Sequence, residues 1–184
     1  MIIGVVGPIA SGKNVITDFL FEKGFVRMSL SEEVRKEARS RGLPIQRKIL
    51  QDIGNEMRLK NGSDYWAGRL ITMMEAGKNY VVEGIRNPGE VTALRKLPGF
   101  ILIAVDAPVE KRFQWIMMRG KDSDPSSLEE VKKIDSRDRG EGEDSHGQQS
   151  IASMQSADFK IVNDSTKEAM RRKAEKIFKK IGVV

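Results

Sequence analysis

The chain has 184 residues, a formal net charge of +6 and no cysteine. This length suits a single α/β domain with a sizeable core, and the lack of cysteine excludes a disulfide framework and a thiolate metal site. Because the chain starts directly in an apolar segment and no apolar run approaches membrane-spanning length, we expect a soluble cytoplasmic protein without a membrane partner.

The first predicted element is a buried strand over residues 1–6, followed by the sequence GPIASGKN at residues 7–14 and an amphipathic helix. Strand, glycine loop and helix in this order predict a phosphate-binding loop. Its glycines let backbone N–H groups point at an anion, the helix adds its positive end, and Lys13 reaches the outer phosphates. The alternative is a tight turn with an incidental lysine. We expect nucleotide contacts from Gly7, Ala10, Ser11, Gly12, Lys13, Asn14 and Val15.

Asn14 stands where the pattern G-x-x-x-x-G-K-[ST] has a hydroxyl residue, and that hydroxyl normally ligates Mg²⁺. An amide oxygen can approach the metal directly or through water, so Asn14 remains a predicted metal ligand. Glu83, at the end of a later strand, is the second, because a carboxylate can hold Mg²⁺ or accept a proton. The sequence therefore predicts a Mg²⁺ site that includes Asn14 and Glu83.

A second strand is predicted at residues 25–28, and a helical segment at residues 30–77 lies between two strands. Ser29 and Glu32 have capping-box spacing and open the first helix of this segment. Apolar residues at four-residue spacing predict the next helix: Ile45, Ile49, Ile53 and Met57. We expect a further helix capped by Ser63.

The second half of the chain alternates strands and helices and has one charged insert. Strands are predicted at residues 80–82, 100–105 and 159–162. Helix starts are predicted at Asn87-Pro88, at Pro108 and at Ser165, the last with Glu168 at capping-box spacing. Residues 121–150 are charged and dotted with glycine, and their apolar trio of Leu128, Val131 and Ile134 predicts a helical lid outside the core.

Strands that alternate with helices predict a parallel sheet with right-handed crossovers. Ligands of such sheets bind beyond the carboxyl ends of the strands, where the glycine loop, Glu83, Asp106 and Asn163-Asp164 fall. Arginine suits phosphoryl transfer because its planar fork holds two phosphate oxygens. The arginines in segments that can converge there are Arg35, Arg86, Arg119, Arg137 and Arg139. Without such a role, Arg35 would be an exposed helix residue, and the last two would lie in a solvated loop.

The last predicted helix carries seven basic and two acidic residues between Lys167 and Lys180. We interpret this charge as the solvated outer face of a helix whose apolar stripe of Met170, Ala174, Ile177 and Ile181 packs on the sheet. Aromatic residues are few and do not alternate with the basic ones, so a nucleic-acid partner is not expected.

Nearly the whole chain resembles the P-loop nucleotide kinases, which include nucleoside monophosphate kinases and dephospho-CoA kinases. The most specific motif is Gly7–Lys13. Residues 83–86 (EGIR) are similar to the Asp-Gly-Phe-Pro-Arg segment of adenylate kinases without its proline. Residues 28–35 are similar to the segment that places an acceptor-binding arginine, and residues 157–164 resemble the last strand, whose end lies near adenine.

The resemblance implies one domain over residues 1–184, with the three-layer P-loop NTPase fold and a five-stranded parallel sheet flanked by helices. It implies ATP and Mg²⁺ as cofactors, an acceptor-binding segment at 30–77 and a lid at 121–150. Catalytic roles would fall on Lys13, Glu83, Arg119, Arg137 and Arg139. Acceptor binding would fall on Arg35, Glu83 and Arg86, and contacts near the ATP base on Arg119 and Asn163.

The acceptor decides between two enzyme hypotheses. A nucleoside monophosphate offers an ionised phosphate and needs no general base, whereas the sugar hydroxyl of dephospho-CoA benefits from a carboxylate. Ser29 and Ser31 stand where dephospho-CoA kinases have that carboxylate, which favours a (deoxy)nucleoside monophosphate. Two alternatives of other classes are a non-catalytic nucleotide-binding switch and an ATPase that acts on nucleic acid. Monomer and homodimer both remain open.

Overall fold

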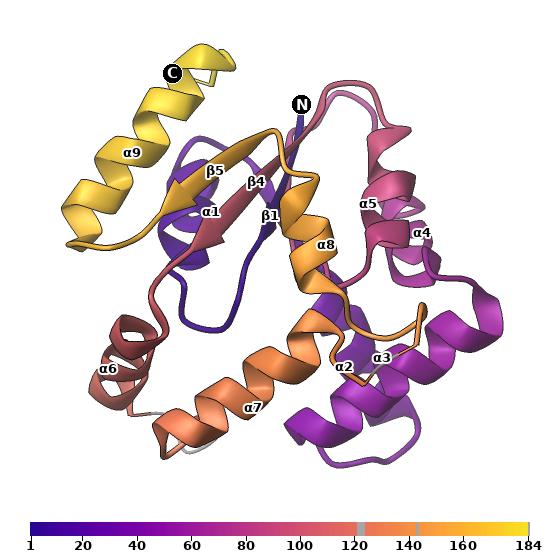
Figure 1. Ribbon diagram of the computed structural model, residues 1–184. Coiled ribbons are helices and arrows are strands. Elements are labelled where there is room, and N and C mark those ends of the chain that lie inside the picture. The colour runs from indigo at the N-terminus through magenta and orange to yellow at the C-terminus, as the bar shows by residue number, and fades with distance from the viewer. Residues whose placement is uncertain (121–123, 143, 184) are drawn as a thin grey trace.

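The fold is described by a computed structural model that covers residues 1–120, 124–142 and 144–183. Its strands are β1 (Ile2–Val6), β2 (Val26–Ser29), β3 (Tyr80–Glu83), β4 (Phe100–Asp106) and β5 (Phe159–Val162). They form a five-stranded parallel sheet in the order β2-β3-β1-β4-β5, with helices on both faces (Figure 1). The expected parallel five-stranded sheet is therefore confirmed.

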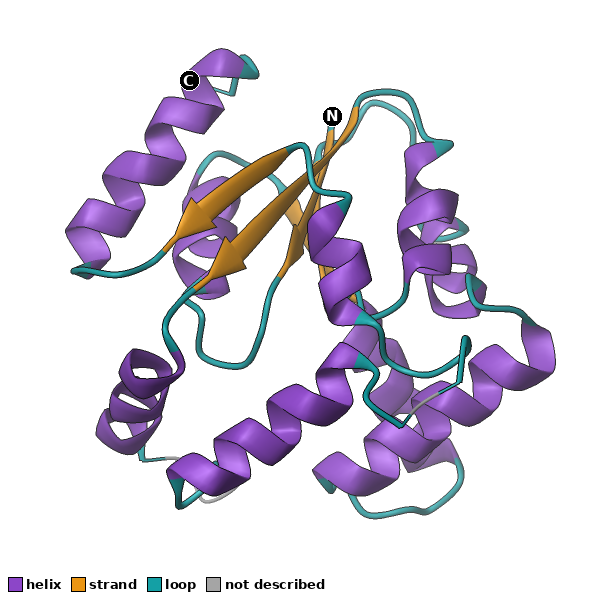
Figure 2. Cartoon of the chain, viewed as in Figure 1, coloured by secondary structure: helices purple, strands orange, loops and turns teal. Residues whose placement is uncertain are grey.

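The helices connect the strands and account for most of the described chain (Figure 2). They are α1 (Lys13–Glu22), α2 (Leu30–Ser40), α3 (Arg47–Asn61), α4 (Tyr65–Ile71), α5 (Pro88–Arg95), α6 (Val109–Arg119), α7 (Leu128–Arg139), α8 (Ser150–Gln155) and α9 (Lys167–Lys180). Three of them, α2, α3 and α4, form the predicted helical segment between β2 and β3. None of the described helices combines the length and apolar character that a membrane span requires.

Side chains of β1 alternate between two cores, as the two-residue period of a strand requires. Ile3 and Val5 face the core that α1 and α9 cover, where the rings of Phe19 and Phe178 stack with centroids 4.9 Å apart. Val6 faces the other core, which is covered by α2, α4, α5 and α8. Burial on both faces explains why the first strand is an unbroken apolar run.

The register of the sheet brings the candidate residues to one edge. Val5 is paired with Glu83 of β3, and Val6 with Ala104 of β4. The glycine loop after β1 therefore starts level with the end of β3 and close to Asp106 at the end of β4. This edge is the one at which parallel α/β sheets bind ligands.

The helix starts correct three of the sequence predictions. Ser29 is the N-cap of α2, but its side chain makes no capping hydrogen bond. The N-cap of α4 is Asp64 rather than Ser63, and that of α9 is Thr166, whose hydroxyl accepts from the N–H of Ala169. Helices α4 and α9 therefore each begin one residue later than predicted from Ser63 and Ser165. The predicted N-terminus of α5 is confirmed as a capping box.

Two further features of the helices differ in part from the sequence analysis, although Met170 and Ala174 of α9 are buried as predicted. The short α8 was not expected, because its six residues, three polar and three apolar, are too few to show a clear apolar period. In α9 the most buried large residue is Phe178, whereas Ile177 and Ile181 lie at the margin of the core.

Candidate active site

The glycine loop of residues 7–12 packs directly against the ends of β4 and β5. A side chain at Gly12, where φ is +95°, would collide with the amide of Asn163. That buried amide donates a hydrogen bond to the carbonyl of Ser11 (3.0 Å). At Gly7 a Cβ would collide with the carbonyl of Val105. Both glycines are therefore required by close backbone approach, and Asn163 fixes the loop from the β5 side.

Lys13 is directed into the same loop. Its Nζ donates to the carbonyls of Gly7 (2.8 Å) and Pro8 (2.6 Å). Burial lowers the pKa of Lys13 to about 7, and the positive charge of Arg86 acts in the same direction. The loop thus holds a cation whose charge is incompletely compensated by the protein, which favours binding of an anion.

Two observations show that the loop fits a phosphate group. Within the described residues no side chain caps α1, and of its first-turn N–H groups that of Val15 donates to the carbonyl of Gly12 (3.0 Å). The positive end of the helix is therefore open to an anion. The hydroxyl of Ser11 is buried without a hydrogen-bond partner among the described residues. Because a buried hydroxyl is normally paired, phosphate oxygens would satisfy it.

Arg112 joins the loop to the predicted lid. Its buried guanidinium donates to the carbonyls of Ile9 (3.2 Å) and Ala107 (3.0 Å). It also forms a two-pronged ion pair with Asp135 of α7, one contact being 3.0 Å. The loop, the β4–α6 connection and α7 therefore share one cation, and bidentate pairs of this kind are strong and directional.

A second buried carboxylate on α7 gathers two arginines. Asp138 Oδ2 accepts from Arg47 Nη2 (3.1 Å) and Arg86 Nη1 (3.2 Å), and its Oδ1 accepts from Gln51 Nε2 (3.2 Å). Arg47 and Gln51 lie on α3, and Arg86 follows β3. Figure 1 shows α7 crossing the open edge of the sheet toward α3. Arg86, one of the two arginines predicted to bind the acceptor, thus lies where α3, α7 and the glycine loop meet.

The turn that carries Arg86 is held by a buried ion pair. Glu90 accepts from the backbone N–H groups of Arg86 (2.7 Å) and Asn87 (3.1 Å), and its other oxygen accepts from Arg58 Nε (2.8 Å). Asn87 also donates to the carbonyls of Ser145 and Gly147. This turn therefore fixes the start of α5 and the segment before α8 relative to each other.

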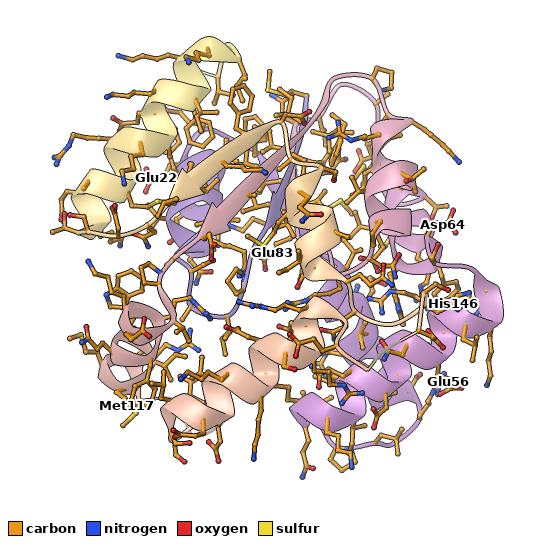
Figure 3. The ribbon with its side chains drawn as sticks, viewed as in Figure 1. Glu22, Glu56, Asp64, Glu83, Met117 and His146 are labelled. Carbon is orange, nitrogen blue, oxygen red and sulfur yellow. The ribbon has the colours of Figure 1, made fainter. Side chains whose placement is uncertain are left out.

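Glu83 and Asn14 are placed differently from each other. Glu83 lies near the middle of the molecule, whereas Glu56, Met117 and His146 lie at its outer parts (Figure 3). The carboxylate of Glu83 has no hydrogen bond or ion pair within the described residues. Its negative charge raises the pKa of Lys13, which opposes the effect of burial. Asn14 is exposed at the start of α1. No group of three or more metal-ligating side chains occurs in the described chain, so a Mg²⁺ ion here would share phosphate oxygens as ligands.

Of the other predicted arginines, Arg35 and Arg119 lie outside this centre, and Arg137 and Arg139 lie at its edge. Arg35 pairs with Glu32 (3.4 Å) on the surface of α2, and Arg119 makes a two-pronged pair with Asp124. Arg137 bonds to Gln51 (3.0 Å) and Asp52 (2.7 Å) of α3. Arg139 is exposed and borders a cavity of about 50 Å³ beside Pro8 and Asp106. The structure therefore brings Lys13, Glu83 and Arg86 together, places Arg137 and Arg139 at the edge of the centre, and leaves Arg35 and Arg119 away from it.

The sequence interpretation missed several residues of the centre: Arg47, Gln51, Asp135 and Asp138. One signal could have found the two carboxylates. The buried residues of α7 are Val131, Asp135 and Asp138, which are spaced by four and three and share one helical face. Of the apolar trio Leu128, Val131 and Ile134 on which the lid prediction rested, only Val131 is fully buried.

Solved structures with this arrangement include kinases. The shikimate kinase of Acinetobacter baumannii, solved in complex with shikimate, matches with a TM-score of 0.57 and 17% identity over 98% of this chain and 92% of that one. An unliganded sugar kinase of Janibacter sp. HTCC2649 matches with a TM-score of 0.52 and 15% identity over 100% of this chain and 97% of that one. The fold is accordingly that of the P-loop kinases. These structures do not distinguish a nucleoside monophosphate kinase from a dephospho-CoA kinase, the two types named in the sequence analysis.

Relatives in sequence cover almost all of the chain, although no family model matches it. It is 35% identical to a UPF0200/UPF0201 protein of Archaeoglobus fulgidus over 98% of the chain, and it spans 55% of that relative's length. It is 32% identical to a UPF0200 protein of Methanosarcina barkeri (93% of the chain, 90% of the relative) and 30% identical to one of Thermococcus onnurineus (98% of each). The chain therefore belongs to the UPF0200 family.

Proposed function

We propose that the chain catalyses phosphoryl transfer from ATP to a small nucleotide-like acceptor, which we take to be a (deoxy)nucleoside monophosphate. The observation that carries this proposal is the convergence of the loop lysine, Lys13, with the guanidinium of Arg86 at the carboxyl edge of the sheet. Phosphoryl transfer needs positive charge on both the transferred phosphoryl group and its acceptor. A P-loop-kinase fold supports the same reaction class.

In this proposal the loop residues Gly7–Val15 hold the ATP phosphates and Lys13 contacts the outermost ones. When bound with ATP, Mg²⁺ neutralises charge that develops on the phosphoryl oxygens; Asn14 and Glu83 would hold it. Asn163 fixes the loop. Arg119, Arg137 and Arg139 are assigned to the phosphates. Arg119, at the end of α6, would reach them only after leaving Asp124, and Arg137 of α7 only after leaving Gln51 and Asp52. Arg139 of α7 is exposed beside the glycine loop. Arg86 is assigned to the acceptor, whereas Arg35, which pairs with Glu32 on the surface of α2, would reach it only after leaving that partner.

The alternative acceptor is a sugar hydroxyl, as in dephospho-CoA. It is favoured by one observation, because Glu83 has no hydrogen-bond partner in the described chain and could accept the hydroxyl proton. A non-catalytic nucleotide switch is the alternative of another class. It would bind ATP through the same loop and need no acceptor.

A panel of acceptors tests these possibilities. ADP formation from ATP and Mg²⁺ is measured with each ribo- and deoxynucleoside monophosphate and with dephospho-CoA. Turnover with a monophosphate supports the favoured function, and turnover with dephospho-CoA alone replaces it. ATP binding without turnover on any acceptor contradicts both enzyme functions and supports the switch.

The lowered pKa of Lys13 predicts that nucleotide binding takes up a proton. At pH 8 a lysine with a pKa of about 7 is mostly neutral, and phosphate oxygens around it raise that pKa. Binding at pH 8 should therefore take up about one proton, and affinity should fall as the pH rises above 7. Calorimetry in buffers of different ionisation enthalpy measures the uptake. Lys13→Met should abolish it, and a value of zero in the unmodified chain would contradict the prediction.

Asn14→Thr tests the unusual end of the glycine loop. The exposed side chain of Asn14 makes no hydrogen bond within the described residues, so its replacement leaves the fold intact. A threonine hydroxyl supplies the usual Mg²⁺ ligand. We expect Mg²⁺-dependent turnover to stay within about twofold or to increase. A loss of more than tenfold at saturating Mg²⁺ would show that the asparagine has a role of its own.

A further inference from the structure

The carboxylate of Asp138 lies between two guanidinium groups. A single oxygen, Oδ2, accepts from both Arg47 and Arg86, at 3.1 and 3.2 Å. Gln51 donates to the other oxygen at 3.2 Å. These groups come from three elements, since Asp138 is on α7, Arg47 and Gln51 are on α3, and Arg86 follows β3. Asp138 is 1% exposed, so its charge is compensated by these neighbours rather than by water.

Arg47 and Arg86 together carry more positive charge and more N–H donors than the single carboxylate of Asp138 can pair with. Arg47 Nε is buried without a hydrogen-bond partner in the described chain. Burial lowers the pKa of Arg47, with a smaller effect in the same direction from Arg86. A phosphate monoester carries nearly two negative charges and three acceptor oxygens, and it therefore matches two forked donors better than a carboxylate does.

We propose that Arg47, Arg86 and Gln51 form the binding site for the phosphate group of the acceptor, and that Asp138 is an internal anion that competes for it. The proposal rests on the proposed function in taking the acceptor to carry a phosphate. Arg47, and not the predicted Arg35, supplies the second guanidinium, because Arg35 pairs with Glu32 on the surface.

A consequence for α7 follows from this competition. The acceptor phosphate and Asp138 cannot both occupy the space between the arginines, so binding of one displaces the other. Asp138 is on the helix whose Asp135 holds Arg112 and, through it, the carbonyl of Ile9 in the glycine loop. Release of Asp138 by the acceptor therefore frees one of the two buried carboxylates that anchor α7 over the site.

Inorganic phosphate is the probe for this site. Because the glycine loop also binds phosphate, calorimetric titrations are made with the full chain carrying Lys13→Ala. In that background Arg47→Gln should weaken phosphate binding by about tenfold, the effect of a lost charged hydrogen bond. Asp138→Asn should strengthen it by about tenfold, because the competing charge is removed. In the double variant the gain from Asp138→Asn should shrink, since both changes act on one site.

Two charge-matched controls are available on the same helices. Lys48→Gln changes the exposed neighbour of Arg47, and Glu129→Gln changes an exposed carboxylate of α7. Both should alter the dissociation constant by less than about twofold. Equal effects of Arg47→Gln and Lys48→Gln, or unchanged or weaker phosphate binding in Asp138→Asn, would overturn the proposal.

The folding of the variants and the proposed phosphoryl transfer are checked separately. Thermal unfolding with and without phosphate shows whether Asp138→Asn folds; if it does not, the comparison of Arg47→Gln with Lys48→Gln decides. Phosphate binding that depends on Lys13 alone rejects this site and leaves the nucleotide loop in place. In the opposite result, phosphate binding depends on Arg47 but no acceptor of the panel leads to ADP formation. That result rejects the proposed phosphoryl transfer and retains the phosphate site.

Discussion

Lys13→Ala is expected to lower the kcat of ATP-dependent transfer by at least about a thousandfold. The ammonium is the cation that the loop directs at the outer phosphates, and charge on those oxygens grows during transfer. Its present partners are backbone carbonyls of Gly7 and Pro8, so the substitution removes no ion pair that holds the fold together. The loss should therefore appear in catalysis and hardly in the free energy of unfolding.

The measurement is ADP formation at saturating ATP and acceptor, combined with denaturant unfolding of the same samples. Lys96→Ala, an exposed lysine at the end of α5, is the matched control and should keep full turnover. Turnover of the Lys13 variant within tenfold of the unmodified chain would show that the chemistry does not take place at the glycine loop.

Arg112→Leu should lower the free energy of unfolding by about 3–5 kcal/mol, because it leaves Asp135 buried without its partner. Arg112 is 2% exposed and Asp135 is 5% exposed. The same change removes a donor to the carbonyl of Ile9, so nucleotide affinity should fall along with stability. These two effects have one cause, which is the shared guanidinium between the glycine loop and α7.

Urea unfolding of single and double variants separates the charge from the packing. Arg112→Leu combined with Asp135→Leu should recover most of the lost stability, since two apolar side chains replace a buried pair at little cost. Arg41→Leu, which breaks exposed pairs with Glu37 and Glu56, should change stability by less than about 1 kcal/mol. A double variant as unstable as the Arg112 variant would show that the pair is needed for more than mutual compensation.

The sequence predicted the sheet and the glycine loop because both depend on local patterns. The strand at residues 1–6 is apolar throughout, and the capping box at Asn87 involves residues three apart. The start of α9 was misplaced by one residue, since Ser165 and Thr166 are both acceptable caps and only packing selects between them.

The centre of the site was harder to predict because its contacts join distant residues. Asp138 bonds to Arg47 and Gln51, which precede it by 91 and 87 residues. In a segment as charged as residues 121–150, the one local signal that separates Asp138, 1% exposed, from its solvated neighbours is its place on the helical face of Val131 and Asp135. Conversely, Arg137 looks like a lid arginine in sequence but bonds to α3 in the structure.

The central position of β1 in the sheet affects how the chain folds during its synthesis. Among the described strands, β1 pairs with β3 and β4, so its backbone N–H and C=O groups have no strand partner until residues 80–83 emerge from the ribosome. At 5–20 residues per second this delay lasts roughly 4–15 s. During that time the apolar segment Ile2–Val6 is exposed on the nascent chain and is a ready target for chaperones. Ribosome-bound intermediates that end before β3 should accordingly be protease-sensitive.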